Sequence, residues 1–465
     1  MELKGRKCIV IGGGKSGLSA ARFLASKGAS VTLNDVASLD HLKRLEGDGI
    51  VLEGGGHRAS LFEEKDIVVL SPGVPANSEP LCSILEEAEK RGAEIISEIE
   101  LGARFISVPI IAVAGTNGKS TTTAFIGQLL SNAGHEVFVG GNIGIPLTEY
   151  LLKGAMAQYI VLEVSSFQLE RIASFRPFIS VLLNITADHL DRYASMDDYI
   201  EAKKQLFKNQ GEGDYAIVNA GDEVAASLIP QIKASVLSLG GSKNSGEGIF
   251  LSDNKMIALT AGVKREIPLS EIRNSPIPHI ENTMAGLGVA SLCNISEKVF
   301  IDTLKCFKGL SHRMELVGSV SGIRFYDDSK ATNVGAVVKT LESVEGKVIL
   351  IAGGKDKGGS YAPLKPAIKD KVKRLILIGE AASKMEDALG GLVETISASS
   401  MDDAVNKARE IAINGDAVLL SPACSSFDMF SDYAERGRVF KEAVSRIIEE
   451  ERGKRAYKEE VPLAG

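Results

Sequence analysis

This 465-residue chain has few cysteines, and none of them forms a paired motif. The five cysteines stand far apart, and no Cys-x-x-Cys sequence occurs; they are Cys8, Cys82, Cys293, Cys306 and Cys424. This spacing supports neither a zinc site nor a disulfide framework. We therefore expect free, buried thiols in a reducing compartment.

Long hydrophobic runs and an excess of positive charge are missing too. No apolar stretch reaches the ~18 residues that a membrane-spanning helix needs, and no signal-peptide pattern precedes the first predicted strand. We expect a cytoplasmic protein without membrane insertion. The 53 basic and 60 acidic side chains give a net charge of −7. Because nucleic-acid binders need basic patches, this balance argues mildly against a nucleic-acid partner.

A glycine-rich turn, Gly115-Thr116-Asn117-Gly118-Lys119-Ser120-Thr121, is the most informative feature that is present. It follows an apolar segment, 109–114, that is typical of a buried strand, and it precedes a predicted helix over 122–133. Such a turn leaves backbone N–H groups at a helix N-terminus, where they can hold phosphate. The position of this turn therefore predicts a phosphate loop.

Three side chains of this loop suit a nucleoside triphosphate. Lys119 would place a cation on the β- and γ-phosphates, and Ser120 or Thr121 would place a hydroxyl on Mg²⁺. The Walker A pattern has a glycine where this chain has Val113, so the match is imperfect. The alternative interpretation is a turn with a structural role only.

Three α/β blocks follow one another along the chain, each opening with an apolar strand and a polar or glycine-rich turn. Alternating strands and helices imply parallel sheets, with ligands at the carboxyl ends of the strands. In the second block, segments 235–239, 248–251 and 256–259 are typical of short antiparallel strands. The predicted domains are residues 1–98, 99–311 and 312–465.

The first block carries a dinucleotide-type fingerprint. Gly12, Gly14 and Gly17 have the spacing G-x-G-x-x-G, and Asp35 follows at the end of the second predicted strand. This predicts a nucleotide diphosphate near Gly14, Ser16 and Gly17. A turn after another strand, 71–75, either helps to hold the same ligand or is an ordinary turn. Taken alone, the fingerprint also allows an oxidoreductase, which leaves the Lys119 loop unexplained.

The second block offers oxygen and nitrogen ligands near the phosphate loop. Glu163 ends the predicted strand 159–164, where a carboxylate is well placed to bind Mg²⁺; the alternative is a charge at a helix N-terminus. His189 lies between two aspartates at a strand end, which favours a metal or phosphate role. Lys203 and Lys204 follow on a predicted helix, where a lysine pair ordinarily marks a solvated face.

The third block contributes three polar loops that follow predicted strands. They are residues 327–333, 353–359 and 421–428. Because the carboxyl ends of parallel strands meet at one edge of a sheet, the three loops together predict a binding rim.

The combination of loops resembles the Mur ligase family, which includes folylpolyglutamate synthases. The phosphate loop carries the general resemblance, and segments Asp328–Asn333 and Ser421–Asp428 resemble the D-glutamate-adding members in particular. The similarity extends from Gly12 to about Arg438. It implies an α/β fold of three domains: a Rossmann-like domain for a UDP substrate, a central P-loop-type ATPase domain with extra antiparallel strands, and a Rossmann-like domain for an amino acid.

The activity implied by this resemblance is the ATP-dependent addition of D-glutamate to UDP-N-acetylmuramoyl-L-alanine through an acyl phosphate. It also implies ATP, two Mg²⁺ ions, small-molecule partners and a monomer. Alternatives that stay open are another Mur-type ligase, a folylpolyglutamate synthase-like ligase, and a nucleotide-gated binding protein without ligase activity.

The resemblance also assigns residues to the two nucleotides. The UDP substrate would contact Asp35, Ser71, Pro72, Gly73, Asn142 and His189, besides the fingerprint turn. ATP would contact Gly115, Thr116, Asn117, Gly118, Lys119, Ser120, Thr121, Asn282, Arg313 and Asp328. Two positions depart from the family pattern: His279 replaces an asparagine and Val36 replaces a threonine.

The remaining assignments concern the amino acid, the metals and catalysis. D-Glutamate would contact Lys330, Thr332, Lys357, Ser426, Phe427 and Tyr433. The metal ligands would be Ser120, Glu163, His189 and Lys203, the last as a carbamate, which turns a cation into an anion that supports the second metal. The catalytic residues implied are Lys119, His189 and Lys203.

Overall fold

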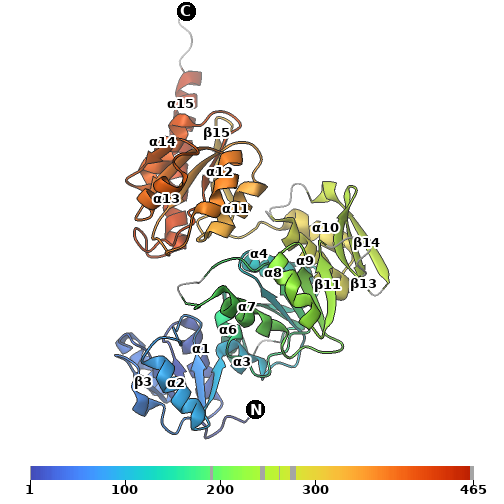
Figure 1. Cartoon of the computed structure of the whole chain (residues 1–465), viewed down its shortest axis with the longest axis vertical. Helices are drawn as coiled ribbons and strands as arrows, with labels where there is room; N and C mark the ends of the chain where they lie inside the picture. Colours follow the sequence, from blue (N-terminus) through green and yellow to red (C-terminus); the bar gives the residue numbers. More distant parts are fainter. Residues whose placement is uncertain are drawn as a thin grey trace, which may run out of the picture. The chain divides into compact units, whose positions relative to one another are not determined.

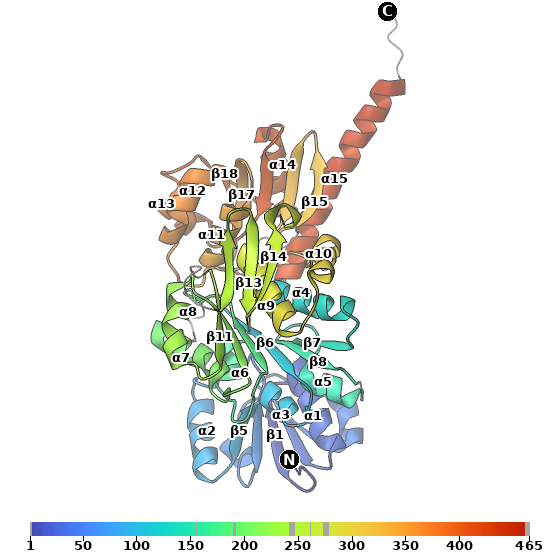
Figure 2. The same cartoon turned by 90° about the vertical axis from the view of Figure 1, so that its right-hand side faces the viewer.

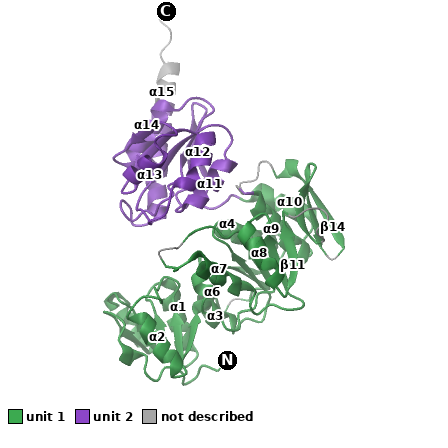
Figure 3. Ribbon diagram, in the orientation of Figure 1, with its two compact units in different colours: residues 1–275, 280–307 green, residues 276–279, 308–465 purple. Residues whose placement is uncertain are grey.

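The computed structural model describes residues 2–154, 156–188, 192–240, 247–260, 262–272 and 279–460. His189 lies outside these ranges. The chain forms two compact units (Figure 3): a larger one, Met1–Ser275 with Ile280–Phe307, and a smaller one, Pro276–His279 with Lys308–Gly465. The domain boundaries at residues 98 and 311 stay predictions.

The first sheet of the larger unit is parallel throughout (Figure 1). Both of its faces are covered, by α1 (Lys15–Ser26) on one side and α2 (Leu81–Lys90) on the other, which explains its almost continuously apolar strands. The strand order is β3 (Ile50–Glu53), β2 (Ser30–Asn34), β1 (Lys7–Ile11), β4 (Ile67–Leu70) and β5 (Glu94–Ser97).

The second sheet belongs to the same unit and combines a parallel part with an antiparallel extension (Figure 2). Strands β11 to β7 are parallel, and β12, β13 and β14 pair antiparallel with one another. The strand order is β14 (Val263–Pro268), β13 (Lys255–Thr260), β12 (Gly248–Ser252), β11 (Ser235–Leu239), β10 (Tyr215–Asn219), β9 (Ile179–Leu182), β6 (Ile110–Ala114), β8 (Tyr159–Glu163) and β7 (Val137–Gly141).

One prediction for this sheet is wrong. Segment 235–239 was expected to be antiparallel, but β11 pairs parallel with both β10 and β12. The chain reaches β11 from β10 through α8 (Glu223–Leu228), and a helical crossover returns the strand in the same direction. The short alternating pattern of β11 does not reveal this connection. The antiparallel pairing of β12 with β13 is as predicted.

Helices cover both faces of the second sheet. Helices α4 and α9 pack against each other and on strands of one face, while α5 to α8 contribute to the core of the other. The helices of this region are α3 (Glu98–Ala103), α4 (Lys119–Asn132), α5 (Leu147–Leu152), α6 (Ser166–Leu169), α7 (Met196–Lys204), α8, α9 (Ile280–Leu292) and α10 (Glu297–Cys306). Short 3₁₀ helices across the chain are η1 (Asp40–Asp48), η2 (Ala59–Leu61), η3 (Gln205–Phe207), η4 (Ile229–Gln231), η5 (Leu269–Glu271) and η6 (Ala362–Leu364).

Buried polar contacts of α3 join the first sheet to the second. Glu100 is fully buried and accepts hydrogen bonds from the backbone N–H groups of Ala173 (3.0 Å) and Phe175 (2.8 Å), besides Ser174 and Arg104. Burial alone would raise the pKa of Glu100, but these donors outweigh it and lower the pKa. The connection at the predicted domain boundary is therefore an ordered helix, held by charge-assisted hydrogen bonds.

The third sheet forms the core of the smaller unit. It is parallel except for β15, which pairs antiparallel with β16. The strand order is β15 (Glu315–Val320), β16 (Ile323–Asp327), β20 (Ala417–Leu420), β17 (Val348–Gly353), β18 (Val372–Ile378) and β19 (Thr395–Ser397). The helices are α11 (Val334–Ser343), α12 (Lys365–Lys371), α13 (Ala382–Leu389), α14 (Met401–Ile411) and α15 (Tyr433–Glu460).

Helix α15 is the longest helix among the described residues, and its backbone stays helical to Glu460. Lysine, arginine, alanine and glutamate dominate this end and favour helix, and the first proline downstream is Pro462. Among the described helices, α15 included, none is both long enough and apolar enough to cross a bilayer.

Candidate active site

The predicted phosphate loop connects β6 to α4, as expected. Gly118 is the residue before α4 and has a φ of +85°, in the left-handed region that favours glycine. A Cβ added to Gly118 would lie 2.5 Å from Oδ1 of Asn282, so the loop and α9 are in close approach. The loop therefore requires glycine for both conformation and space.

Asn184 holds this loop from the neighbouring strand. Its Oδ1 accepts hydrogen bonds from the N–H groups of Thr116 (3.1 Å) and Asn117 (2.8 Å), and its Nδ2 donates to the carbonyl of Asn117 (3.1 Å). Asn184 follows β9, which pairs with β6. Sequence reasoning did not assign a site role to Asn184, although a polar residue just after the strand beside a phosphate loop is the signal that could have found it.

Two lysines converge on one carbonyl oxygen of the loop. Nζ of Lys119 donates to the carbonyls of Gly115 (2.9 Å) and Thr116 (2.8 Å), and Nζ of Lys203 donates to the same Gly115 oxygen (2.9 Å). Two cations that share one acceptor repel each other, which matters for the protonation of Lys203.

Lys203 is buried, with 2% of its surface exposed, and its Nζ lies 4.6 Å from the ring centroid of Tyr199. Burial and the charge of Lys119 lower the pKa of Lys203 well below its ordinary value, and the charges of Asp188 and Glu163 oppose this only in part. The solvated face inferred from the residues alone is wrong for Lys203. The next residue, Lys204, instead pairs with Glu201 (2.6 Å).

Glu163 brings two further predicted residues together. Its Oε2 accepts a hydrogen bond from Oγ of Ser120, and its Oε1 accepts one from Nδ2 of Asn142 (2.9 Å). Glu163 is itself buried, at the carboxyl end of β8. Strand pairing explains the arrangement, because β8 lies between β6, which leads to Ser120, and β7, which leads to Asn142.

Two buried amide side chains of the larger unit have an unpaired nitrogen. Nδ2 of Asn282, on α9, and Nε2 of Gln168, on α6, make no hydrogen bond to any described residue, although both side chains are at least 97% buried. A buried amide without an acceptor is costly. Asn282 was predicted to contact ATP, and Gln168 was missed.

The turns that follow β1, β2 and β4 in the first sheet contact one another. Asp35 accepts a hydrogen bond from the N–H of Gly13 (2.6 Å), and Oγ of Ser71 donates to the carbonyl of Gly12 (3.2 Å). Gly17 packs so tightly that an added Cβ would lie 1.8 Å from the Gly12 oxygen. The fingerprint turn is therefore in contact with the turn that begins at Ser71.

Arg192 connects these turns to the second sheet. Its Nη1 donates to the carbonyl of Pro72 (3.0 Å), and its guanidinium stacks on the ring of Phe167 at 3.7 Å. Nδ2 of Asn77 donates to the Arg192 carbonyl (3.3 Å). Sequence reasoning did not single out Arg192, which follows the His189 motif by three positions.

In the smaller unit, Asp328 is a buried carboxylate held by two hydroxyls. Its Oδ2 accepts from Oγ1 of Thr340 (2.7 Å) and Oγ of Ser421 (3.0 Å), while the N–H of Met314 donates to its Oδ1 (3.3 Å). Burial raises the pKa of Asp328 to about 6, and these donors offset the effect only in part.

Replacing Asp328 with asparagine is expected to affect the stability of the smaller unit more favourably at pH 8 than at pH 5, and to weaken the use of ATP. The unfolded carboxyl ionises near pH 3.8 and the folded one near pH 6. Ionisation of Asp328 therefore contributes nothing to the stability of the folded state below pH 3.8. It destabilises the folded state increasingly as the pH rises to 6, and this effect is fully present above pH 6. Thermal unfolding should show a more favourable change in Tm at pH 8 than at pH 5. Equal changes at both pH values would contradict this linkage.

The resemblance implies that Asp328 contacts ATP, and a neutral amide is a weaker hydrogen-bond acceptor than a carboxylate. On that assignment, the same variant should lower kcat/KM for ATP about tenfold. With Asp328 present, kcat/KM for ATP should fall as the pH drops below 6, since the carboxyl becomes protonated. In the asparagine variant, kcat/KM for ATP should no longer fall as the pH drops below 6. A profile unchanged by the substitution would remove Asp328 from the nucleotide site.

The predicted D-glutamate residues lie on loops that touch one another. Nζ of Lys330 lies 3.9 Å from the ring centroid of Tyr433. The N–H of Lys355 donates to the carbonyl of Ser425 (2.9 Å), which brings the loop of Lys357 beside that of Ser426. Ser426 is buried, whereas Phe427 is 68% exposed and Lys357 is exposed. Thr332 lies on the loop of Lys330 and donates its N–H to the Lys330 carbonyl (2.8 Å).

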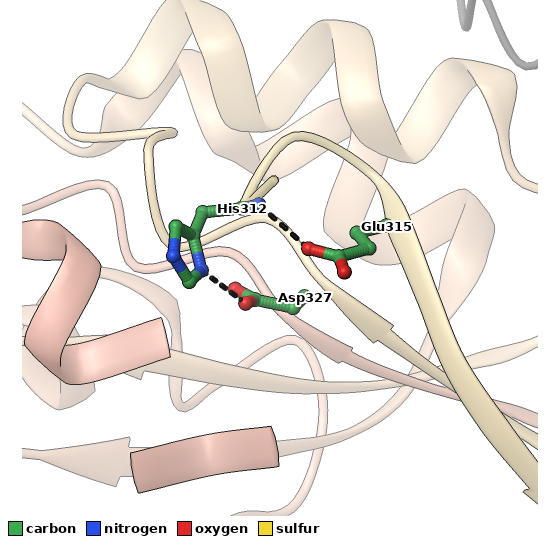
Figure 4. A group of neighbouring side chains, drawn as sticks. All are labelled: His312, Glu315 and Asp327. Carbon is green, nitrogen blue, oxygen red and sulfur yellow. Dashed lines mark hydrogen bonds and ion pairs between the residues drawn. The ribbon is translucent and has the colours of Figure 1, made fainter. Parts of the chain in front are cut away.

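Arg313 lies between two residues in an uncommon backbone conformation. His312 and Met314 have φ values of +63° and +49°. Figure 4 shows the contacts that hold His312: its Nδ1 lies 2.6 Å from Oδ2 of Asp327, and its N–H donates to Glu315 (2.9 Å). Although these three side chains are close enough to hold a metal ion, Lys441 also donates to Glu315 (2.6 Å). The group is therefore a hydrogen-bonded frame around Arg313.

Three family models match the chain in the order of its sheets. They are a Mur ligase MurD-like N-terminal domain over residues 6–97, a Mur ligase middle domain over 113–290, and a Mur ligase glutamate ligase domain over 312–424. A protein of Geotalea daltonii, named UDP-N-acetylmuramoylalanine–D-glutamate ligase, is 46% identical over 451 residues, covering 96% of this chain and 99% of that protein. The chain belongs to the Mur ligase family.

Solved structures share the fold of this Mur ligase. A pseudomurein peptide ligase type C from Methanothermus fervidus has a TM-score of 0.58 at 21% identity, over 95% of this chain and 100% of that one. The MurF ligase from Thermotoga maritima in complex with ADP has a TM-score of 0.58 at 17% identity, over 96% of both chains. At such identities the likeness concerns the fold alone, and it confirms the predicted α/β architecture.

Proposed function

We propose that this Mur ligase adds D-glutamate to UDP-N-acetylmuramoyl-L-alanine in a reaction driven by ATP, in peptidoglycan precursor synthesis. The observation that carries the proposal is the 46% identity, over 96% of the chain, to a protein named for that activity. The loops that resemble the D-glutamate-adding members lie on one edge of the third sheet, after β16 and β20, which pair in parallel.

The phosphate loop region is suited to ATP and Mg²⁺. A buried carboxylate and a hydroxyl, Glu163 and Ser120, meet beside the loop, and oxygen ligands of this kind are those that Mg²⁺ prefers. The unpaired Nδ2 of Asn282 offers a buried donor to an acceptor of the nucleotide. When bound, Mg²⁺ would neutralise phosphate charge, with Glu163 and Ser120 among its ligands and His189 as a further proposed one.

Carbamoylation of Lys203 is part of the proposal. Only a neutral amine adds carbon dioxide, and burial beside Lys119 favours the neutral form of Lys203. The resulting carbamate would carry a negative charge next to the Lys119 cation, so the modification would replace a repulsion with an attraction. Its oxygens would support a second Mg²⁺.

The proposed reaction transfers the γ-phosphoryl group and then displaces it. A carboxylate oxygen of the UDP substrate attacks the γ-phosphorus and ADP leaves, which gives an acyl phosphate. The amine of D-glutamate then attacks the acyl carbon, loses a proton and expels inorganic phosphate. In the first step Lys119 offsets the repulsion between anions. Lys330 and Lys357 suit an acceptor with two carboxylates, because each offers an ammonium group.

The test is a measurement of ADP release with purified protein, ATP, Mg²⁺ and UDP-N-acetylmuramoyl-L-alanine. Release should depend on D-glutamate and should be accompanied by one amide bond per ADP. L-Glutamate and D-glutamine serve as matched acceptors and should support far less turnover. ADP formation that needs no amino acid, or that requires a folate acceptor, would refute the assignment.

We also propose that the enzyme works as a monomer in the cytoplasm, where ATP and UDP-sugars are available. All of the proposed partners are small molecules. Sedimentation of the purified protein with and without substrates tests the oligomeric state.

A further inference from the structure

Arg436, on α15, is a buried arginine whose hydrogen-bond partners are three backbone carbonyls and one hydroxyl. Only 1% of its surface is exposed. Its Nε donates to Oγ of Ser329 (2.9 Å), its Nη2 to the carbonyls of Ser329 (2.9 Å) and Cys424 (3.1 Å), and its Nη1 to the carbonyl of Ser425 (3.1 Å). Within the described part of the chain, no carboxylate forms an ion pair with it.

These acceptors belong to the loops that carry the proposed D-glutamate residues. Ser329 precedes Lys330, and Ser425 precedes Ser426. Oγ of Ser329 also donates to the carbonyl of Tyr433 (2.8 Å). The loop after β17 is part of the same arrangement, because a Cβ added to Gly354 would lie 3.0 Å from Nη1 of Arg436. One guanidinium therefore fixes the spacing of three loops and the start of α15.

The charge of Arg436 is poorly compensated. Carbonyl groups are dipoles and offer no full negative charge, and burial lowers the pKa of Arg436 to about 10, so that it stays a cation at neutral pH. The charges of Asp428 and Asp327 act on it without a hydrogen bond. A buried cation behind a rim of loops attracts anions to that rim, and the effect is stronger where water is excluded.

We propose that Arg436 is the positioning residue of the amino-acid-binding loops, and that its buried charge favours an acceptor with two carboxylates over a neutral one. This rests on the proposed function. Arg436 itself touches no substrate in this proposal; it sets the spacing of Lys330, Ser426 and Tyr433 through their neighbours. Asp328, which is proposed to contact ATP, is held separately by Thr340 and Ser421. KM for ATP should therefore depend on Arg436 far less than KM for D-glutamate does.

Two substitutions separate geometry from charge. Arg436→Lys keeps a cation but loses the planar fork of donors, so KM for D-glutamate should rise about tenfold. Arg436→Met removes both, and KM should rise on the order of a hundredfold. In both variants KM for ATP and for the UDP substrate should change less than about twofold. The preference for D-glutamate over D-glutamine, measured as a ratio of kcat/KM, should narrow in Arg436→Met and persist in Arg436→Lys.

The matched control is Arg438→Met, because Arg438 lies two residues further along the same helix and is exposed. It should leave all three KM values unchanged. Ser329→Ala removes one hydroxyl that links Arg436 to Tyr433 and should raise KM for D-glutamate about threefold. Thermal unfolding shows which variants are folded. If Arg436→Met is not folded, the KM values of Arg436→Lys and Ser329→Ala decide the proposal.

The proposal is overturned if kcat falls with all KM values unchanged, or if the three KM values rise together, since either result indicates a purely structural role. Wild-type protein that releases no ADP in response to D-glutamate would refute the proposed function instead. If the wild type turns over a neutral amino acid preferentially, the proposed role of the Arg436 charge is wrong, whatever the variants show.

Discussion

Replacement of Lys119 by methionine is expected to lower kcat/KM for ATP by about 10³-fold while the protein stays folded. Nζ of Lys119 donates to the carbonyls of Gly115 (2.9 Å) and Thr116 (2.8 Å), which places its positive charge on the loop that is proposed to hold the phosphates. A preorganised donor aimed at developing charge contributes roughly 10²–10³ in rate, and Lys119 also contributes to phosphate binding.

The stability of this variant should change little, since methionine retains most of the apolar length of lysine and the loop keeps its contacts with Asn184. Calorimetry with a non-hydrolysable ATP analogue measures the loss of affinity, and ADP release measures the loss of rate. Lys119→Arg is the matched control, because it keeps the positive charge but changes the length and shape of the side chain. Turnover by Lys119→Met within threefold of the wild type would show that the loop does not hold the triphosphate.

Lys203→Ala should lower ligase activity about 10²–10³-fold, with partial recovery when acetate or another short-chain carboxylate is added. Alanine leaves a buried space where the side chain of Lys203 was, next to the Gly115 carbonyl and the ring of Tyr199. A small carboxylate in that space would supply the oxygens that the proposed carbamate provides in the wild type. Chloride at the same ionic strength controls for a general salt effect.

The adjacent Lys204→Ala is the control for Lys203, because Lys204 pairs with Glu201 near the surface. It should keep full activity and should not respond to acetate. Full activity of Lys203→Ala would contradict a role for the carbamate. Loss of activity without recovery in any carboxylate, combined with an unchanged Tm, would favour a role for the amine itself.

The two lysine variants are coupled through their shared carbonyl. Removing the charge of Lys119 should raise the pKa of Lys203, because one of the two causes that lower it disappears. A higher pKa leaves less neutral amine to accept carbon dioxide. Part of the loss in Lys119→Met is therefore expected to come from a less modified Lys203, and the effects of the two substitutions should not add.

Local motifs made the fold and much of the site predictable from the sequence. The phosphate loop was placed correctly because a strand, a glycine turn and a helix are adjacent in the chain, and the helix begins at Lys119 because Gly118 adopts the left-handed conformation. The proximity of Glu163 to the loop of Ser120 followed from the position of Glu163 at a strand end beside that loop, whereas Asn142 came from the family resemblance alone. The individual contacts of these residues with ligands stay predictions.

Features that depend on tertiary packing were not predictable in this way. Nothing local distinguishes Lys203 from Lys204, and only packing against Tyr199 and the loop buries the first of them. Arg436 lies in a helix rich in charged residues, so its burial under three loops has no local sign. The direction of β11 was missed because a period of two residues is the same in parallel and antiparallel strands.

The buried carboxylate of Glu100 has a practical implication for anyone who engineers this ligase. It lies on the helix between the sheet that carries the fingerprint turn and the sheet that carries the phosphate loop, and it makes hydrogen bonds to both its own helix and the turn at 173–175. A substitution there would disturb the fingerprint turn and the phosphate loop together, although the hydrogen bonds of Glu100 are to Arg104 and residues 173–175. Designs that alter surface charge, exchange domains or graft loops should therefore leave residues 97–104 unchanged.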